Sequence, residues 1–337
     1  MKEVRRLQVT GGSTYIISLP KEWVLRHGLK KGDHVVLLSC GDKLVIAPRD
    51  VEAERSVDYR VSRKRDDAEE VVRQVISYYL AGYDAIRVIF DEPWEDLRVR
   101  IKKVIRKKML GFEVSSEDQG HVEIRSLMRH GEFPLTSTVR RLFELVGLIL
   151  NDIMAALEGL DRKVADDIIA QDDDVDRLYL YMMRTIRYRI SQAPLGSEEV
   201  IEPYEYVIYT MVVKALERIA DHVVRIAHIL KALRNAPQPE ILDGIVSMLR
   251  ESADLFVRAK EAFLRRDSKA ANEIINSAKK LLARETELTK MIERARQELH
   301  TAILCRIMIE SARRIGEYAA DIGEMTVDLA TTPPGSR

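Results

Sequence analysis

The sequence predicts a mainly α-helical protein, in which tandem three-helix bundles follow a small α/β layer and an N-terminal β-hairpin module. Three observations support this fold class. Apolar residues recur with a helical period almost without interruption from Pro134 to about Ala330. Aromatic residues make up only 6% of the 337 residues, whereas the helix-favouring residues Ala, Leu, Arg and Glu are plentiful. The chain before Pro134 instead alternates short β-branched stretches with glycines and short amphipathic segments.

Residues 1–50 hold the β-hairpin module. The segment VTGGSTYIISLP predicts a Gly-Gly turn and then a strand that ends at Pro20, and KEWVLRHGL predicts a short helix that ends at Gly28. The segment KKGDHVVLLSCGDKLVIAP predicts a second hairpin with its turn at Gly41-Asp42. So few residues can hardly bury a core, and a second copy of the module is therefore expected to complete it. The module has nine basic and five acidic residues, a net charge of +4 per chain.

Residues 51–130 predict a small layer structure of order βαβαββ. Its strands are SVDYRV, DAIRVIF, GFEVSS and HVEIRSL, and its helices are DDAEEVVRQVISYYLAG and WEDLRVRIKKVIRKKML. The second helix has an apolar stripe and, on its remaining surface, seven basic residues: Arg98, Arg100, Lys102, Lys103, Arg106, Lys107 and Lys108. These bases could extend a nucleic-acid surface or form an ordinary solvated helix face, and we favour the second interpretation.

Residues 131–337 predict a helical domain of about six helices. Breaks in the period fall near 159–161, 193–198, 235–239, 266–268 and 295. An internal repeat supports this count, because ALEGLDRKVADDII (156–169) aligns with AFLRRDSKAANEII (262–275). Likewise, ERIADHVVRIA (217–227) aligns with RRIGEYAADIG (313–323). The simplest interpretation is two three-helix repeats, at about 134–234 and 238–330.

Composition indicates a cytoplasmic protein that does not insert into a membrane. The chain has no apolar run long enough to span a bilayer as a helix, and its N-terminus lacks the apolar core of a signal peptide. The two cysteines, Cys40 and Cys305, stand alone, without a CxxC partner or a disulfide framework. Lys and Arg together number 54, as do Asp and Glu, so the net charge alone indicates no partner.

Carboxylates spaced four residues apart recur on the predicted helices. The three pairs are Glu217 with Asp221, Asp172 with Asp176, and Glu317 with Asp321. On a mostly apolar helix two such carboxylates project side by side and repel each other. A bound cation would remove that repulsion, and hard carboxylate oxygens suit Mg, Mn, Fe or Zn. The alternative is a solvated helix face with ordinary ion pairs, such as one between Asp221 and Arg225.

The front module resembles the AbrB/SpoVT type of swapped-hairpin DNA-binding domain found in antitoxins. The resemblance rests on the Gly-x-Ser turn, the Lys31-Gly32-Asp33 turn and the closing LVIAP. It implies a homodimer formed through residues 1–50, and DNA as a partner. The residues expected to contact DNA are Arg5, Arg6 and Lys21 at the phosphates, and Ser13, Thr14 and Tyr15 near the bases. A module that only dimerises is the alternative.

The helical domain resembles the PhoU family over about 134–330. LERIADHVVRIA matches the LERIGDH-type signature of that family, and ARRIGEYAADIGE is a weaker second copy. The resemblance implies tandem three-helix bundles, a role in phosphate-uptake regulation, and a divalent or trivalent metal ion (Fe, Zn, Mn or Mg) on the carboxylates. Arg313 stands where the second motif would have its Glu, which moves the second pair to Glu317 and Asp321.

The sequence predicts a regulator and not an enzyme. It contains no ExxH motif on facing helices, no HExxH, and no P-loop or GxGxxG in a fitting context, and no catalytic residue is expected. The first hypothesis is a phosphate-responsive, DNA-binding transcriptional regulator of phosphate uptake with a metal-binding sensor body. The alternative is a signalling adaptor that docks on a phosphate transporter or its kinase, with the front module serving only for dimerisation. Sequence-specific DNA binding would separate the two.

Overall fold

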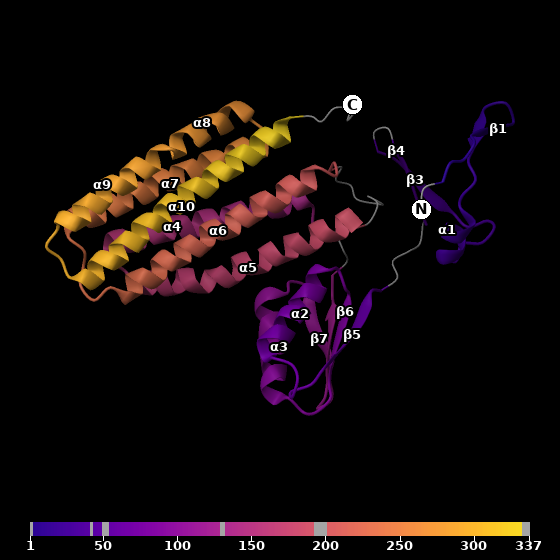
Figure 1. Ribbon diagram of the computed structural model, residues 1–337, viewed down its shortest axis with the longest axis horizontal. Coiled ribbons are helices and arrows are strands. Elements are labelled where there is room, and N and C mark those ends of the chain that lie inside the picture. Colours follow the sequence, from indigo (N-terminus) through magenta and orange to yellow (C-terminus); the bar gives the residue numbers. More distant parts are fainter. Residues whose placement is uncertain (1–2, 41–42, 49–53, 129–131, 192–200, 332–337) are drawn as a thin grey trace. The chain divides into compact units, whose positions relative to one another are not determined.

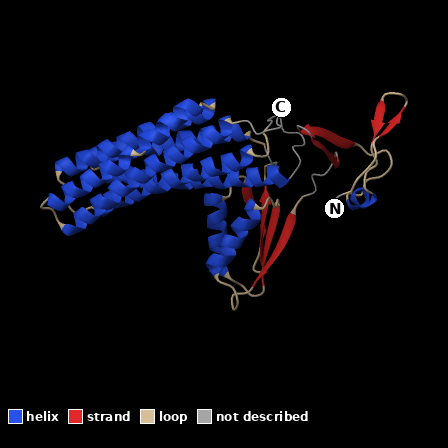
Figure 2. Cartoon of the chain, turned by 45° about the horizontal axis from the view of Figure 1, so that its top comes forward, coloured by secondary structure: helices blue, strands red, loops and turns tan. Residues whose placement is uncertain are grey.

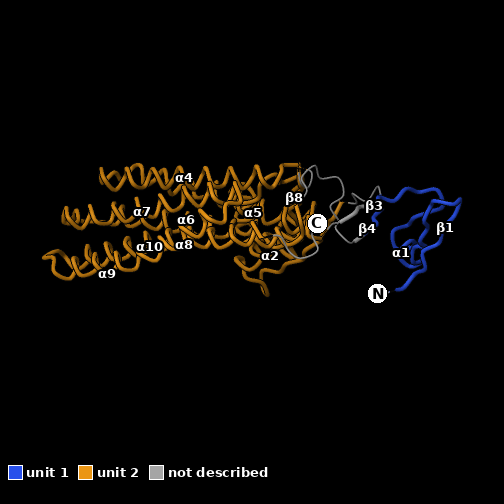
Figure 3. Tube along the Cα trace, turned by 90° about the horizontal axis from the view of Figure 1, so that it is seen from above, with its two compact units in different colours: residues 1–53, 193–196, 335–337 blue, residues 54–192, 197–334 orange. Residues whose placement is uncertain are grey.

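The computed structural model describes residues 3–40, 43–48, 54–128, 132–191 and 201–331 (Figure 1). These residues belong to two compact units, a front module that ends before residue 54 and a larger unit that begins at Glu54 (Figure 3). The larger unit contains an α/β layer and a helical bundle. The predicted mainly α fold class is therefore confirmed, and all strands of the described ranges end at or before Ser126.

The front module consists of two antiparallel hairpins separated by a short helix. Its elements are β1 (Gln8–Thr10), β2 (Thr14–Ile16), α1 (Lys21–Arg26), β3 (Val35–Cys40) and β4 (Lys43–Pro48). Gly11 and Gly12 form the first turn with φ angles of 60° and 85°, a region that favours glycine. Gly28 (φ 62°) follows the helix as a left-handed terminator. The predicted second turn at Gly41-Asp42 lies outside the described residues.

The front module has almost no core of its own. Among its residues with described side chains, Ala47 is the one buried hydrophobic residue. Its large exposed apolar side chains are Val4, Leu7, Val9, Tyr15, Ile16, Ile17, Leu25, Leu37 and Leu44. The strand predicted to reach Pro20 ends at Ile16, because no described segment of the same chain pairs with residues 17–19. This apolar surface is far larger than single exposed residues would give, which is typical of a surface that another chain covers.

The α/β layer has the predicted order βαβαββ. Its elements are β5 (Ser56–Val61), α2 (Ala68–Leu80), β6 (Ala85–Phe90), α3 (Glu95–Lys108), β7 (Phe112–Glu117) and β8 (His121–Ser126). The sheet order is β5-β6-β8-β7; β5 and β6 are parallel, and the other pairs are antiparallel. Both helices lie against one face of the sheet (Figure 2), where Leu97, Ile101 and Ile105 of α3 are buried.

Seven helices form the bundle in the described part of the chain, one more than predicted. They are α4 (Leu135–Gly159), α5 (Arg162–Ser191), α6 (Glu205–Ala232), α7 (Pro239–Arg265), α8 (Ser268–Ala278), α9 (Lys280–Arg294) and α10 (Leu299–Ala330). The extra boundary is Lys279, which keeps helical backbone angles (φ −57°, ψ −25°), so α8 and α9 are one kinked helix. Ser277 Oγ donates a hydrogen bond to the carbonyl of Glu273 at 2.8 Å, a contact that bends helices. Neither Pro nor Gly marks the kink in the sequence.

The two repeats share local geometry at equivalent positions. Leu160 and Arg266 both adopt the left-handed conformation, with φ of 49° and 53°. The next residues, Asp161 and Asp267, each accept hydrogen bonds from two backbone N–H groups and cap the following helix. The turn and the helix cap are therefore the same in both repeats. This agreement is expected if the two repeats arose by duplication of one helical hairpin.

One continuous apolar core runs through both repeats. Phe143 of α4 lies 5.8 Å from Phe256 and 5.9 Å from Phe263 of α7, measured between ring centroids. Tyr209 of α6 makes an edge contact with Phe263 at 5.6 Å. The repeats are therefore one folded body and not two independent bundles. None of the helices in the described residues combines the length and the apolar character needed to cross a bilayer.

Candidate functional site

Carboxylates of α5 and α6 face one another in the first repeat. Burial raises the pKa of Asp172 to about 6, and the negative charges of Asp176 and Asp221 act in the same direction. Asp221 is exposed, as Asp321 is in the second repeat, but partial burial still raises its pKa, and the charge of Glu217 acts in the same direction. The structure thus brings the four predicted first-repeat residues into one region, where their ionised forms destabilise one another.

The side chain of Glu217 is only 14% exposed. Its Oε1 accepts a hydrogen bond from Lys214 Nζ at 2.7 Å. Its Oε2 is buried without a hydrogen-bond donor, 3.8 Å from Arg218 Nε. A buried oxygen without a donor is uncommon in native proteins and leaves an acceptor open to a cation.

The donor set of the first repeat fits a metal ion in its chemistry. Hard carboxylate oxygens are present, Lys108, Lys214 and Arg218 offset their mutual repulsion only in part, and Glu217 Oε2 lacks a hydrogen-bond donor. The side chains are not gathered into a finished site, since no three His, Cys, Asp or Glu residues in the described ranges converge on one point. Binding would therefore draw the carboxylates of α5 and α6 together.

The second-repeat pair lies in a different electrostatic environment. Arg313 contacts Oε1 of Glu317, and Arg314 donates to Oε2 at 2.6 Å. Asp321 is exposed, and its pKa is raised by partial burial and by Glu324. Because guanidinium groups already hold both oxygens of Glu317, these residues do not fit a metal ion as they stand.

Sequence reasoning missed Glu285, which balances the arginines of the second repeat. Its side chain is 8% exposed and forms ion pairs with Arg306 at 2.8 Å and Arg313 at 2.5 Å. Glu285 occurs in the apolar phase of α9, between the buried Leu281 and Leu288. The sequence did contain a signal for this contact, which is a carboxylate within an apolar stripe. A buried charge requires a partner, so the position of Glu285 indicates a basic residue packed against it.

The basic helix α3 is neither a free nucleic-acid surface nor simply solvated. Five of its bases contact acidic side chains, in the pairs Arg98–Glu95, Arg100–Glu69, Lys102–Glu117, Lys107–Asp173 and Lys108–Asp176. The last two pairs join the end of α3 to α5 of the bundle. Lys108 Nζ lies 2.8 Å from Asp176 Oδ2, so a base of the layer reaches one of the predicted metal ligands.

Arg184 of α5 anchors the α/β layer to the bundle. Its side chain is 5% exposed, and its guanidinium lies over the rings of Tyr79 at 5.1 Å and Phe112 at 4.8 Å. It also donates to the carbonyl of Tyr79 and to Asp84 Oδ1, the latter at 3.3 Å. Nothing in the helical period of α5 indicates a buried arginine at this position.

The predicted DNA-contacting residues lie along the first hairpin and its flanks. Arg6 and Lys21 are exposed, whereas Arg5 pairs with Glu3. Ser13 is in the turn, and Thr14 and Tyr15 begin β2, with Tyr15 68% exposed. The hairpin therefore presents polar and aromatic groups to solvent, as contact with a nucleic acid requires.

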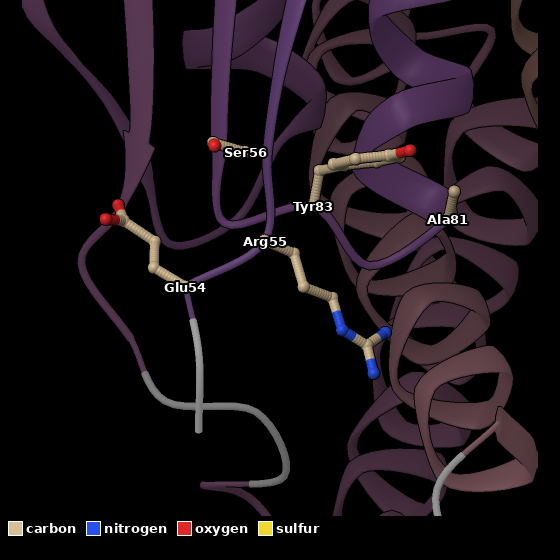
Figure 4. Close-up of a pocket in the computed structure, with 5 residues that line it drawn as sticks. All are labelled: Glu54, Arg55, Ser56, Ala81 and Tyr83. Atoms are coloured by element: carbon tan, nitrogen blue, oxygen red, sulfur yellow. The ribbon is translucent and has the colours of Figure 1, made fainter. Parts of the chain in front are cut away.

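A hollow of about 540 Å³ lies where the chain enters the α/β layer (Figure 4). It is lined by Glu54, Arg55, Ser56, Ala81 and Tyr83. Its charged groups already contact the protein: Glu54 pairs with Arg125 at 2.9 Å, and Arg55 lies over the ring of Tyr188 at 5.3 Å. The charged groups of the hollow are therefore already engaged within the protein and give no basis for selecting a charged ligand.

Curated relatives are similar to more than half of the chain. A phosphate-specific transport system accessory protein PhoU homolog of Clostridium acetobutylicum is 26% identical over 216 residues, covering 58% of this chain and 91% of the relative. A protein of the same description from Borreliella burgdorferi is 26% identical over 196 residues, covering 54% and 85%.

Two solved structures share the fold of the bundle. The phosphate transport system regulatory protein PhoU from Streptococcus pneumoniae has a TM-score of 0.53 and 19% identity, covering 58% of this chain and 93% of that one. PhoU from Pseudomonas aeruginosa has a TM-score of 0.53 and 18% identity, covering 58% and 94%.

Family matches cover both ends of the chain. Residues 8–53 match the family described as antidote-toxin recognition MazE, bacterial antitoxin, which confirms the predicted type of front module. The PhoU domain matches residues 139–230 and again residues 245–326. These two matches span just over half of the sequence, and the chain therefore belongs to the PhoU family.

Proposed function

We propose that the protein is a phosphate-responsive transcriptional regulator that controls phosphate uptake and binds DNA through its front module. The observation that carries this proposal is the joining of a MazE-type domain and a PhoU domain in one chain. Its relatives are named as accessory and regulatory proteins of phosphate transport, which supports the physiological context. In this proposal the carboxylates of α5 and α6 bind a metal ion as part of the sensor body, and the protein has no catalytic role.

A signalling adaptor that docks on a phosphate transporter or its kinase is the second candidate. It is favoured by one observation, the description of the relatives as accessory proteins of a transport system. In that case the front module would serve for dimerisation alone. Dimerisation itself is common to both candidates.

Removal of residues 1–50 is expected to weaken or alter self-association while the rest of the chain stays folded. The front module exposes most of its apolar side chains, whereas the layer and the bundle have cores of their own. Sedimentation velocity at several concentrations measures the effect. A truncated chain with the stoichiometry and affinity of the full chain would show that assembly does not use the swapped hairpin.

Replacement of Arg5 and Arg6 with Ala is expected to weaken binding to specific and random duplex DNA alike. Each phosphate neutralised contributes about 0.9 to the slope of log affinity against log salt. A dimer of the variant lacks four positive charges, so the slope should shrink by up to about 3–4 units. Fluorescence anisotropy titrations between low and physiological salt measure both quantities.

The matched control replaces Arg140 and Arg141, a second pair of consecutive arginines, which lies on the exposed face of α4. It removes the same charge from the helical body and should leave the salt slope unchanged. If the wild-type dimer binds no duplex DNA near physiological ionic strength, the DNA-binding proposal is wrong and the adaptor is favoured.

A further inference from the structure

One face of α5 carries the α/β layer. The residues on this face are Asp173, Asp176, Leu180, Arg184 and Tyr188, which recur at three or four residues. Asp173 and Asp176 pair with the end of α3, and Leu180 packs against the core of the layer. Arg184 and Tyr188 complete the contact further along the helix. The layer is therefore held at two places, by ion pairs at one end of the face and by a buried guanidinium nearer the other.

Asp176 takes part in two groups of charges at once. Its Oδ2 accepts a hydrogen bond from Lys108 Nζ of the layer. Its charge also raises the pKa of Asp172 and of Asp221, two carboxylates of the bundle. The Lys108 ammonium partly offsets the charge at Asp172 as well. A side chain of the layer thus supplies positive charge to a region where the bundle itself concentrates negative charge.

We propose that Lys108 is an internal competitor for the first-repeat carboxylates, so that a metal ion bound there displaces it from Asp176 and loosens the α3 end of the layer. The proposal rests on the metal-binding part of the proposed function. Asp176 is the shared ligand, and an ammonium group and a metal ion repel each other when both approach one carboxylate. The Arg184 contact lies two turns away and involves none of these carboxylates, so it remains in place.

Thermodynamic linkage makes the competition measurable from either direction. If a metal ion weakens the Lys108–Asp176 contact by some factor, loss of Lys108 strengthens metal binding by the same factor. Lys108→Met keeps the unbranched stem and removes the charge, whereas Lys108→Arg keeps the charge. Lys107→Met is the matched control, because it removes the same charge one residue away, where the partner is Asp173.

Titration with Mn²⁺, followed by its electron paramagnetic resonance signal in the full-length protein, tests the proposal. Lys108→Met should lower the Kd for Mn²⁺ by about 5-fold or more, the lower end of typical coupling between sites. Lys107→Met and Lys108→Arg should stay within about 2-fold of wild type, because Lys107 pairs with Asp173, which is outside the proposed donor set, and arginine keeps the charge at position 108. Amide hydrogen exchange at residues 105–109 should also rise when the wild type is saturated with Mn²⁺, and stay unchanged in Lys108→Met.

The outcomes separate this inference from the function on which it rests. Equal Kd values for wild type and Lys108→Met would overturn the role of Lys108 and leave the metal site standing. An equal gain in Mn²⁺ affinity in Lys107→Met would also overturn the role of Lys108. The gain would then follow from the loss of any nearby positive charge. If no variant binds Mn²⁺, or Zn²⁺ in a competition assay with a fluorescent indicator, both the metal site and the competitor fail.

Discussion

If the proposed metal site exists, the variant that combines Glu217→Ala with Asp221→Ala is expected to lose nearly all of the metal bound by the wild-type protein. These two side chains supply the α6 half of the donor set, and the oxygen without a donor belongs to Glu217. Asp172 and Asp176 would remain, but two carboxylates of one helix rarely suffice for a stable site. Elemental analysis of protein purified without chelators measures the metal content.

The matched control for this variant is Glu317→Ala with Asp321→Ala in the second repeat. It should keep wild-type metal content, because Arg313 and Arg314 already hold Glu317. The metal-free first-repeat variant should melt no lower than metal-free wild type, since a raised pKa of Asp221 means that the fold disfavours its ionised form at neutral pH. Equal metal content in the first-repeat variant and wild type would contradict the assignment.

Arg184→Met is expected to lower the free energy of unfolding by about 3 kcal/mol, since removal of one partner from a buried charged contact costs on this order. The variant leaves the carbonyl of Tyr79 without this donor and removes a cation from between two aromatic rings. The methionine retains part of the apolar stem of the arginine. The loss of stability therefore measures mainly the contribution of the guanidinium group. Urea denaturation followed by circular dichroism measures the change.

Arg187→Met provides the comparison, because Arg187 is exposed on the same helix. Surface substitutions of this kind usually change stability by less than about 0.5 kcal/mol. If the free energy of unfolding falls by the same amount in both variants, the buried Arg184 contact contributes no more to stability than an exposed arginine does. If Arg184→Met unfolds in two separate steps where wild type unfolds in one, the contact couples the layer to the bundle.

Most secondary-structure elements were predictable because each has a local cause. The α/β layer follows from alternating strand and helix periods, and Asp67 caps α2 at the start of the segment predicted to be helical. The break at Lys279 was missed because the apolar period does not change there, no Pro or Gly stands there, and the backbone itself stays helical. The end of β2 at Ile16 was missed because a strand requires a paired neighbour, which a single chain does not provide here.

The candidate site was predictable within each helix but not between helices. Spacing of four residues correctly placed Glu217 and Asp221 on one face of α6. It could not show that Lys108, which belongs to a different layer of the fold, contacts Asp176. Nor could it show that Glu285 pairs with Arg313. Contacts of this kind depend on how the helices pack, which periodicity does not specify.

Helix α5 belongs to the bundle and also contacts the α/β layer. This double role limits how the layer could be transferred to another protein. The Clostridium acetobutylicum relative matches 58% of this chain over 91% of its own length. A graft of residues 54–128 alone onto another bundle would leave behind the Arg184 guanidinium that lies over the Tyr79 and Phe112 rings. The transferable segment therefore includes the docking face of α5 as well, and the layer is not a self-contained cassette although its sequence is contiguous.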